Sequence, residues 1–305
     1  MTREAEFRTE ADAPPTDLAL YTRAAHTASA TIIQAYSTSF GMATRLLAPE
    51  LRPRVEDVYA LVRIADEIVD GAAAEAGLCV EDQRRLLDRL EADTEDALHT
   101  GYSANVVVHA FASTARAVGF GSELTRPFFS SMRRDLSPVD FTADELSAYI
   151  YGSAEVIGLM CLRIFLAGEQ ISTDRRLRLE TGARRLGAAF QKINFLRDLG
   201  VDWSELGRNY FPGIDPVRLT ERQKLDLVVD IERDLGAAAD TIPELPDGCR
   251  RAIVAAHALF AELGDRIRAT PARELVHTRV SVPTRTKVAI LLRATAARGG
   301  GRAHR

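Results

Sequence analysis

The sequence predicts an all-α protein that folds as a single domain. Apolar residues recur at helical spacing from Leu18 onward. Strand signals are absent, because the one valine-rich run, at 105–108, lies inside a helical period. Breakers such as Gly119, Gly121 and Pro138 separate the helical stretches. With 305 residues, of which 46% are hydrophobic and 27% charged, the chain can bury a large core.

The elements follow from this pattern in chain order. Residues 1–16 mix charge, alanine and proline without periodicity, so we expect a disordered leader. An all-helical domain is expected over 17–297, and the basic segment 298–305 is expected to be a flexible tail. Thr142 and Glu145 form a capping-box pattern at the start of one helix. Helices are predicted over 17–36, 52–70, 80–99, 104–118, 123–136, 142–167, 173–201, 219–238, 247–268 and 283–297.

Composition and charge argue against several classes of protein. The net charge of −4 and the scattered basic residues give no reason to expect nucleic acid binding. Cys79, Cys161 and Cys249 lie far apart, which argues against a zinc site or a disulfide framework and fits a reducing compartment. The N-terminus has no secretory signal, and no uninterrupted apolar run approaches the roughly 18 residues that span a bilayer. We therefore expect a cytoplasmic protein without an obligate protein partner, which could contact a membrane peripherally through its basic tail.

Four polar residues recur along one face of the helix predicted at 173–201. They are Gln191, Asn194, Asp198 and Asp202, and the last three are each four residues apart. Two carboxylates at this spacing repel each other by about 0.2–0.5 kcal/mol, so a positive group is expected between them. That group is either a basic side chain or a hard cation such as Mg²⁺, and the spacing alone leaves both open.

A second acid pair ends the helix predicted at 52–70. Asp66 and Asp70 share a face with Arg63, and Asp70 lies where the helix dipole disfavours a carboxylate. The simplest interpretation is a solvated acidic helix end with Arg63 as a surface salt bridge. However, this helix is apolar nearly all round, and buried carboxylates need partners. Two such helices that face each other could hold several Mg²⁺ ions around a diphosphate, with Arg63, Arg197 and Arg208 adding phosphate contacts.

Five segments in correct order make the chain similar to the squalene/phytoene synthase family of head-to-head prenyltransferases. The resemblance implies an isoprenoid-synthase helical fold around a central apolar cavity. The matching segments are Ser37-Thr-Ser39-Phe40, Tyr59 to Asp70, Tyr149 to Gly158, Gln191 to Asp202 and Leu206 to Pro212. A late basic segment with Arg279 and Lys287 is also similar, but the resemblance assigns it no role.

The resemblance also implies roles for individual residues. Asp66 and Asp70 would hold Mg²⁺ on the first diphosphate to ionise. Asn194 and Asp198, with Asp202 behind them, would hold Mg²⁺ on the other; Mn²⁺ could substitute. Asp202 could instead hold Arg208 or a water. The implied catalytic residues are Asp66, Asp70, Tyr149, Asp198 and Asp202, with Tyr149 beside the carbocation. The implied diphosphate-binding residues are Ser39, Tyr59, Arg63, Gln191, Arg197, Arg208 and Tyr210.

Three positions depart from the family pattern. Tyr36 and Thr38 stand where many members carry a basic residue, so a phosphate contact would come from Arg45 or be absent. Glu155 replaces a small residue on the helix expected to line the pocket, and either points away or adds a carboxylate there. Phe260 stands where a tyrosine is frequent.

The similarity favours one activity and leaves alternatives. The first acid motif and the Tyr149 helix are most like those of bacterial phytoene synthases. Such an enzyme condenses two geranylgeranyl diphosphates, by Mg²⁺-assisted ionisation and through a cyclopropyl diphosphate, to phytoene in carotenoid biosynthesis. The alternative is a C30 squalene or dehydrosqualene synthase that uses two farnesyl diphosphates. No NADPH is expected, because no dinucleotide-binding fingerprint is present.

Two further alternatives do not involve catalysis. A non-catalytic assembly protein of this fold would typically have lost the aspartates, which are all present. A structural bundle with solvated acid faces does not explain acid pairs on apolar helices. The apolar run at 158–165, together with Phe128, Phe129, Met132 and Leu136, fits a cavity wall and would look the same as plain core.

Overall fold

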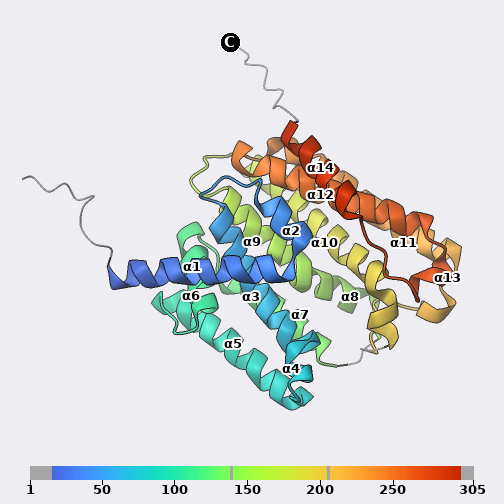
Figure 1. Cartoon of the computed structure of the whole chain (residues 1–305), viewed down its shortest axis with the longest axis horizontal. Coiled ribbons are helices and arrows are strands. Elements are labelled where there is room, and N and C mark those ends of the chain that lie inside the picture. Colours follow the sequence, from blue (N-terminus) through green and yellow to red (C-terminus); the bar gives the residue numbers. More distant parts are fainter. Residues whose placement is uncertain (1–15, 138–139, 205–206, 297–305) are drawn as a thin grey trace, which may run out of the picture.

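The computed structural model describes residues 16–137, 140–204 and 207–296 and is helical throughout, without a strand in these ranges (Figure 1). The expected leader, apart from Thr16, and the expected tail lie outside the described residues. The helices are α1 Asp17–Tyr36, α2 Thr38–Thr44, α3 Arg52–Asp70, α4 Ala72–Glu75, α5 Val80–Thr100, α6 Val106–Val118, α7 Ser122–Asp135, α8 Ala143–Ile150, α9 Val156–Phe165, α10 Thr173–Ser204, α11 Glu221–Ala239, α12 Asp247–Ala269, α13 Ala272–Leu275 and α14 Thr284–Ala296. A π-helical turn, η2 Tyr151–Glu155, joins α8 to α9, and 3₁₀ turns form at η3 Pro216–Arg218 and η4 Ile242–Glu244.

The all-α prediction is confirmed, and the long helices lie close to their predicted ranges. Sequence reasoning missed α2, α4 and α13, because helices of one or two turns contain too few residues to show a period. The start of α2 is fixed locally, since the Ser37 hydroxyl accepts a hydrogen bond from the backbone N–H of Phe40 at 3.0 Å.

The helix predicted over 142–167 is continuous from Ala143 to Phe165, but its centre is a π-helical turn. The backbone widens into the π turn η2 just after Tyr149, whose carbonyl accepts a hydrogen bond from the Ser131 hydroxyl of α7 at 3.1 Å. Gly152 brings η2 against the Pro127 carbonyl, where a Cβ would not fit. A donor from the neighbouring helix α7 thus bonds to a carbonyl that in a regular helix bonds only within the helix. This contact cannot be read from the sequence of α8 and α9 alone.

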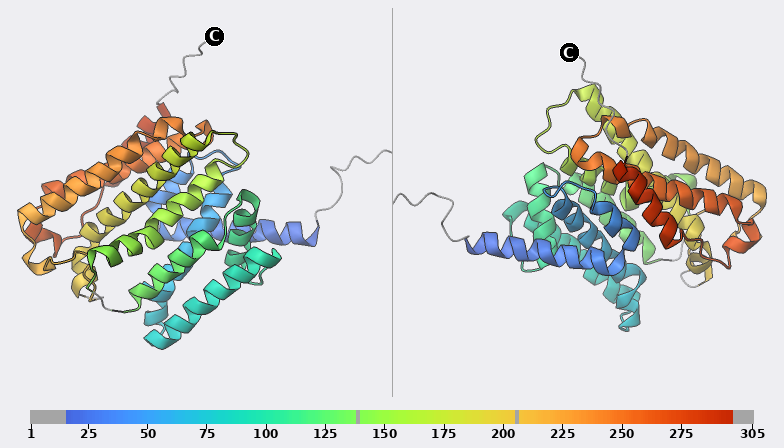
Figure 2. Two further views of the ribbon diagram at one scale, coloured as in Figure 1. Left: turned by 180° about the vertical axis from the view of Figure 1, so that it is seen from behind. Right: turned by 45° about the horizontal axis from the view of Figure 1, so that its top comes forward.

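The long helices pack in series around one interior. In the left view of Figure 2 the segments coloured teal, green, yellow and orange lie side by side, from α5 through α7 and α10 to α11. Helix α1 lies across α3 and α6, while α10 contacts α9, η2, α11 and α12. Both α3 and α10 end on the lower side in Figure 1, so the carboxyl ends of the two acid-bearing helices come together.

Two glycines hold α10 unusually close to the segment formed by η2 and α9. A Cβ on Gly158 would lie 2.5 Å from the Ala183 carbonyl oxygen, and one on Gly187 would lie 2.6 Å from the Ala154 carbonyl oxygen. Backbone therefore packs on backbone at these positions, and the spacing of the two helices is fixed by the absence of side chains.

Gly158→Ala is expected to destabilise the protein by about 1–3 kcal/mol, because the added methyl group must push two packed helices apart. The matched control is Gly236→Ala in α11, where a Cβ meets nothing within 4 Å and where alanine is the better helix former. Thermal unfolding should show a lower Tm for Gly158→Ala and an unchanged or higher one for Gly236→Ala. Equal Tm values for the two variants would contradict the close packing.

One stretch, Ala143–Phe165, is long and apolar enough to cross a membrane by length and composition. Sequence inspection passed over it because Glu155 and Arg163 interrupt the apolar run. In the fold, 56% of its most apolar window is buried, and one of its faces lines the internal cavity. Its composition is therefore that of a core helix, which passes the same test.

Candidate active site

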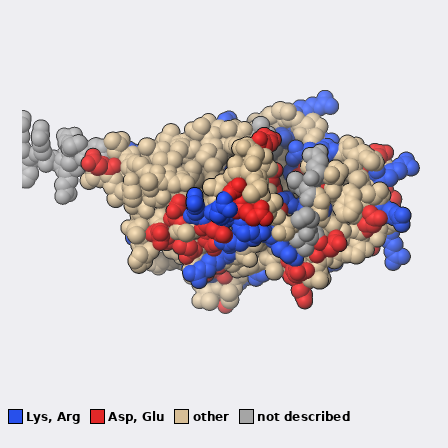
Figure 3. All heavy atoms as spheres, turned by 90° about the horizontal axis from the view of Figure 1, so that it is seen from below, with Lys and Arg blue, Asp and Glu red and all other residues tan. Residues whose placement is uncertain are grey.

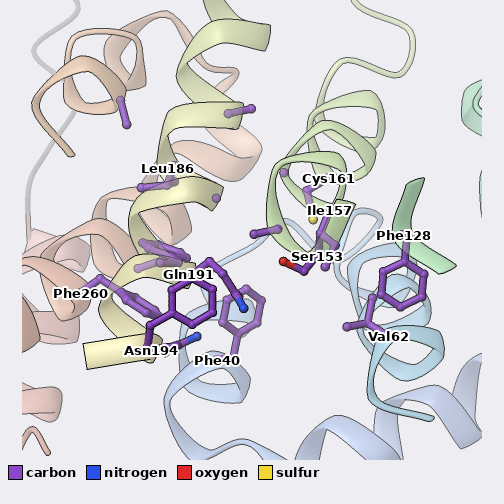
Figure 4. A pocket seen from close by; sticks show the side chains of 18 of the residues that line it. Phe40, Val62, Phe128, Ser153, Ile157, Cys161, Leu186, Gln191, Asn194 and Phe260 are labelled. Atoms are coloured by element: carbon purple, nitrogen blue, oxygen red, sulfur yellow. The ribbon is translucent and has the colours of Figure 1, made fainter. Parts of the chain in front are cut away.

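A cavity of about 450 Å³ lies between α3, α7, α9, α10 and α12. Figure 4 shows that Leu186, Gln191 and Asn194 of α10 face Ser153 of η2 and Ile157 of α9 across this space. Most of the wall is apolar, whereas one end carries carboxylates and arginines from the ends of α3 and α10. This combination suits a ligand with a long apolar body and a strongly anionic head.

Ten of the residues predicted for the site line this one cavity. They come from three separate helices and the segment after α10, so the fold brings the two acid pairs together as the spacing suggested. The ten are Asp66, Asp70, Tyr149, Gln191, Asn194, Arg197, Asp198, Asp202, Arg208 and Tyr210.

Of the other three predicted residues, Tyr59 and Arg63 are not part of the described lining. Ser39 lies in α2, and its side chain is outside the part of the structure that is described. Tyr59 lies behind the wall and stacks on Phe40, with ring centroids 6.0 Å apart; Phe40 itself faces the cavity. Arg63 is paired within its own helix.

Arg63 is held by its own helix and by an aromatic ring. Its guanidinium pairs with Glu67 one turn later, lies 3.8 Å from Asp66 and stacks 4.4 Å above the centre of the Tyr36 ring. The salt-bridge interpretation of Arg63 therefore holds for the ligand-free protein. Tyr36, which stands where relatives often carry a basic residue, contributes a cation–π contact to an arginine from α3. Glu67 was overlooked in the sequence, although its spacing of four from Arg63 could have revealed the pair.

Arginines occupy the positions between the carboxylates at the polar end. Arg208 donates to Asp70 at 2.5 Å, and it also donates to the backbone carbonyl of Asp135. Asp198 accepts hydrogen bonds from Arg197 at 3.1 Å and from Arg279 at 2.7 Å. Arg279 lies between α13 and α14, so sequence similarity pointed to its segment but only the fold gives it a partner. Basic side chains, one of the two kinds of positive group left open by the spacing, therefore contact a carboxylate of each acid pair.

Three of the acid-motif carboxylates, Asp66, Asp198 and Asp202, have shifted pKa values. Burial and the nearby Asp70 charge raise the pKa of Asp66 to about 7. Burial and the Asp198 charge likewise raise the pKa of Asp202 to about 7. Burial acts in the same direction on Asp198, but hydrogen bonds and charge from Arg197 and Arg279 outweigh it and lower the pKa of this group. Asp198 is therefore the carboxylate that stays charged most firmly, whereas Asp66 and Asp202 would gain most from a bound cation.

Asp135 is a central residue of the site that sequence reasoning missed. It ends α7, is only 7% exposed and lines the cavity. Its carboxylate accepts hydrogen bonds from the Tyr149 hydroxyl at 2.8 Å and from the Tyr210 hydroxyl at 3.3 Å. Burial raises the pKa of Asp135 to about 8, against the opposing effect of Arg208. The available signal was a carboxylate on the apolar face of α7, three residues after Met132, but it has no acidic partner at helical spacing.

Aromatic rings surround this carboxylate. The rings of Phe195 and Tyr210 stack with centroids 4.1 Å apart, and the Tyr149 ring lies 5.5 Å from that of Tyr210. Further along the wall, Phe260 stacks on Phe190 at 3.6 Å, and both line the cavity. Phe260 thus supplies a ring face without the hydroxyl that a tyrosine would bring.

Glu155 does not add a carboxylate to the cavity. It lies on η2 but is absent from the lining, and it accepts a hydrogen bond from Arg184 at 2.6 Å. The side chain points away, as one of the two alternatives from the sequence proposed. The face that the molecule presents on the lower side of Figure 1 carries acidic and basic side chains close together rather than a field of one sign (Figure 3).

The donor set fits a hard divalent cation. The Asn194 amide oxygen is buried and has no hydrogen-bond partner, and its residue lines the cavity one helical turn before Asp198. An unpartnered buried oxygen beside carboxylates is the kind of ligand that Mg²⁺ prefers. Among the described residues, no three His, Cys, Asp or Glu side chains are close enough to hold an ion by themselves. A ligand's own oxygens would therefore have to complete the coordination.

A deep apolar cavity with acid-bearing helices at one end is the arrangement that the resemblance to an all-α isoprenoid-synthase fold implies. The chain belongs to the squalene/phytoene synthase family, since the model of that family matches residues 33–216, which is more than half of the sequence. The fold prediction drawn from the resemblance is confirmed.

Individual relatives agree with this assignment. The chain is 29% identical over 269 residues to a 15-cis-phytoene synthase of Paracoccus, covering 84% of this chain and 86% of that one. It is 26% identical to a phytoene synthase of Pseudescherichia vulneris, covering 76% and 79%. Among solved structures, a dehydrosqualene synthase in complex with a ligand aligns with a TM-score of 0.74 at 22% identity, over 92% of this chain and 98% of that one. A squalene synthase of Alicyclobacillus acidocaldarius aligns with a TM-score of 0.68 at 19% identity, over 82% and 95%. These two structures share the fold.

Proposed function

We propose that this protein is a prenyltransferase that joins two geranylgeranyl diphosphates head to head and forms phytoene. The observation that carries the proposal is the cavity, whose apolar walls end in two acid pairs, with three arginines hydrogen-bonded to Asp70 and Asp198. The preference for C20 substrates rests on the relatives that are named phytoene synthases. The C30 alternative is the second candidate, because the family model that matches the chain covers squalene as well as phytoene synthases.

Three arginines at the polar end are the candidate contacts for an entering diphosphate. Arg197, Arg208 and Arg279 pair with carboxylates, and a diphosphate would offer them oxygens of higher charge density. Exchange from carboxylate to phosphate would free Asp70 and Asp198. Asp66, Asp70, Asn194, Asp198 and Asp202 would then hold Mg²⁺, which supplies the charge that drives departure of the diphosphate.

The cavity walls would then stabilise the allylic cation and keep water away from it. The Tyr149 hydroxyl donates to Asp135, so its oxygen lone pairs and its ring face remain available to stabilise positive charge at the first carbon of the substrate. Phe195 and Tyr210 extend this aromatic surface, and the apolar wall excludes water that would trap the cation. Each departing diphosphate leaves a cation that is finally quenched by loss of a proton, and the released pyrophosphate is our candidate for the proton acceptor.

The proposal is tested by incubating the purified full chain with Mg²⁺ and either C15 or C20 diphosphate, followed by extraction and identification of the hydrocarbon. We expect phytoene from the C20 substrate, with the same yield whether NADPH is added or omitted. A C30 hydrocarbon from the C15 substrate at the higher rate would favour the alternative. No product from either substrate would exclude the prenyltransferase function.

A further inference from the structure

Two buried side chains separate the closed end of the cavity from a second pocket. Phe165, the last residue of α9, and Leu245, just after η4, line both the main cavity and a surface pocket of about 570 Å³. They are 7% and 6% exposed, respectively. Nothing else in the chain belongs to the lining of both spaces, as far as the described residues show, so these two side chains form the partition between them.

The partition is held in place from its outer side. The Leu245 carbonyl accepts a hydrogen bond from the Nε of Arg250 at 3.0 Å. The carboxylate of the preceding residue, Glu244, accepts two hydrogen bonds from Arg178, both at 2.9 Å. The backbone carbonyl of Glu244 accepts a hydrogen bond from Arg175. Bidentate guanidinium contacts restrict the geometry of this short loop, so Leu245 cannot easily swing away from the cavity.

The second pocket carries charged side chains on the outer side of the partition. Its lining includes Arg175, Arg250, Glu169 and Asp247, which would lose hydration against a hydrocarbon. An apolar tail that grows along the main cavity therefore ends at Phe165 and Leu245.

The depth of the cavity can be compared with the length of a prenyl chain. Leu179, near the closed end, and Asn194, near the polar end, are 15 residues apart on α10, which corresponds to about 22 Å of helix. Each five-carbon unit adds roughly 5 Å to an extended chain, because four bonds of about 1.5 Å advance along a zigzag. A C20 chain is then roughly 19 Å long and a C25 chain roughly 24 Å long. The first fits within the depth of the cavity, whereas the second exceeds it.

We propose that Phe165 and Leu245 form the floor that limits the prenyl chain lying along α9 and α10 to C20. Truncation of either side chain deepens the apolar end of the cavity by the volume of that side chain and so admits a prenyl diphosphate that is one five-carbon unit longer. The inference rests on the proposed function in one respect: the proposed function places the diphosphate at the acid pairs, so that the prenyl tail points toward the floor.

The test compares wild type with Phe165→Ala, Leu245→Ala and the control Leu166→Ala, which truncates a neighbouring buried side chain that lines neither space. Each protein is given C20 and C25 diphosphates, and kcat/KM is measured for both. We expect the C25-to-C20 ratio to rise at least tenfold in Phe165→Ala and Leu245→Ala and to stay unchanged in Leu166→Ala, because discrimination by a pocket amounts to about 10–200-fold per methylene group.

A binding measurement tests the floor independently of the proposed catalytic activity. Isothermal titration with the unreactive C20 and C25 thiolodiphosphates, in the presence of Mg²⁺, should show tighter C20 binding to wild type and near-equal binding of both analogues to Phe165→Ala. If wild type makes no hydrocarbon but the binding preference shifts as expected, the floor stands and the proposed function fails. If C20 turnover persists and neither floor variant changes the C25-to-C20 ratio, the floor is wrong. Should Phe165→Ala fail to fold, Leu245→Ala decides the question by the same two readouts.

Discussion

Asp66→Asn and Asp198→Asn are each expected to lower the turnover of geranylgeranyl diphosphate by about 10²–10³-fold while leaving the helical circular dichroism unchanged. The two residues lie on different helices but line the same cavity. An amide keeps the shape of the side chain and removes the charge that a divalent cation requires. Metal-bound charge contributes several kcal/mol to ionisation, and each 1.36 kcal/mol corresponds to a factor of ten in rate.

Glu155→Gln is the matched control for both variants. It removes one carboxylate from the wall-forming segment η2, but that carboxylate points outward to Arg184 and is absent from the cavity lining. Turnover of this variant should equal that of wild type within a factor of two. Full activity in Asp66→Asn would contradict cation binding at the first acid pair, and full activity in Asp198→Asn would contradict it at the second.

The second large effect is expected at Asp135. Asparagine replaces the Oδ2 atom, which lies 3.0 Å from the Tyr149 hydroxyl and accepts from it, with an NH2 group that can only donate, so the Tyr149 hydroxyl faces a donor in place of an acceptor. We expect Asp135→Asn to reduce turnover by roughly 10²-fold, and Tyr149→Phe to do the same, because both act on the electrostatics near the cation. The double variant should be little worse than either single one, since the residues act as a unit.

Stability measurements distinguish this positioning role from a structural one. The pKa of Asp135 is raised by burial to about 8, so the folded protein binds this proton more tightly than the unfolded chain. Stability from this group is fully present below the ordinary carboxyl pKa and is lost as pH rises through about 8. Asp135→Asn keeps a neutral group, so its Tm should fall less than that of wild type between pH 5 and pH 8.5. A variant that is both inactive and markedly less stable at pH 8.5 would indicate that Asp135 serves packing alone.

The two acid pairs could be predicted because the spacing that pairs their residues lies within a single helix. Spacing of four places Asp66 with Asp70 and Asp198 with Asp202 on a helix face, and their apolar surroundings indicate burial. The fold then brings both helix ends to one cavity, as expected from the resemblance. Arg63 illustrates the limit of such reasoning, because the sequence left open a surface salt bridge and a phosphate contact, and the structure shows a pair with Glu67 that had not been anticipated.

What the sequence did not reveal depends on contacts between distant segments. Asp135 gains its role from Tyr149 and Tyr210, which lie 14 and 75 residues away along the chain. The π turn after Tyr149 depends on a hydroxyl of α7, and Arg279 reaches Asp198 from 81 residues away. No periodicity within one helix encodes such pairs. The partition at Phe165 and Leu245 likewise exists only because α9 and η4 end at the same place.

The most direct test of the central claim is the ratio of pyrophosphate released to C40 hydrocarbon formed when the wild-type chain is given geranylgeranyl diphosphate and Mg²⁺. The two facing acid pairs are proposed to act on two diphosphates in one cavity, so we expect two pyrophosphates per phytoene, and both products should disappear when the metal is chelated. Pyrophosphate release without a C40 hydrocarbon, or hydrocarbon formation that continues in the presence of chelator, would contradict the assignment of this cavity to metal-assisted head-to-head condensation.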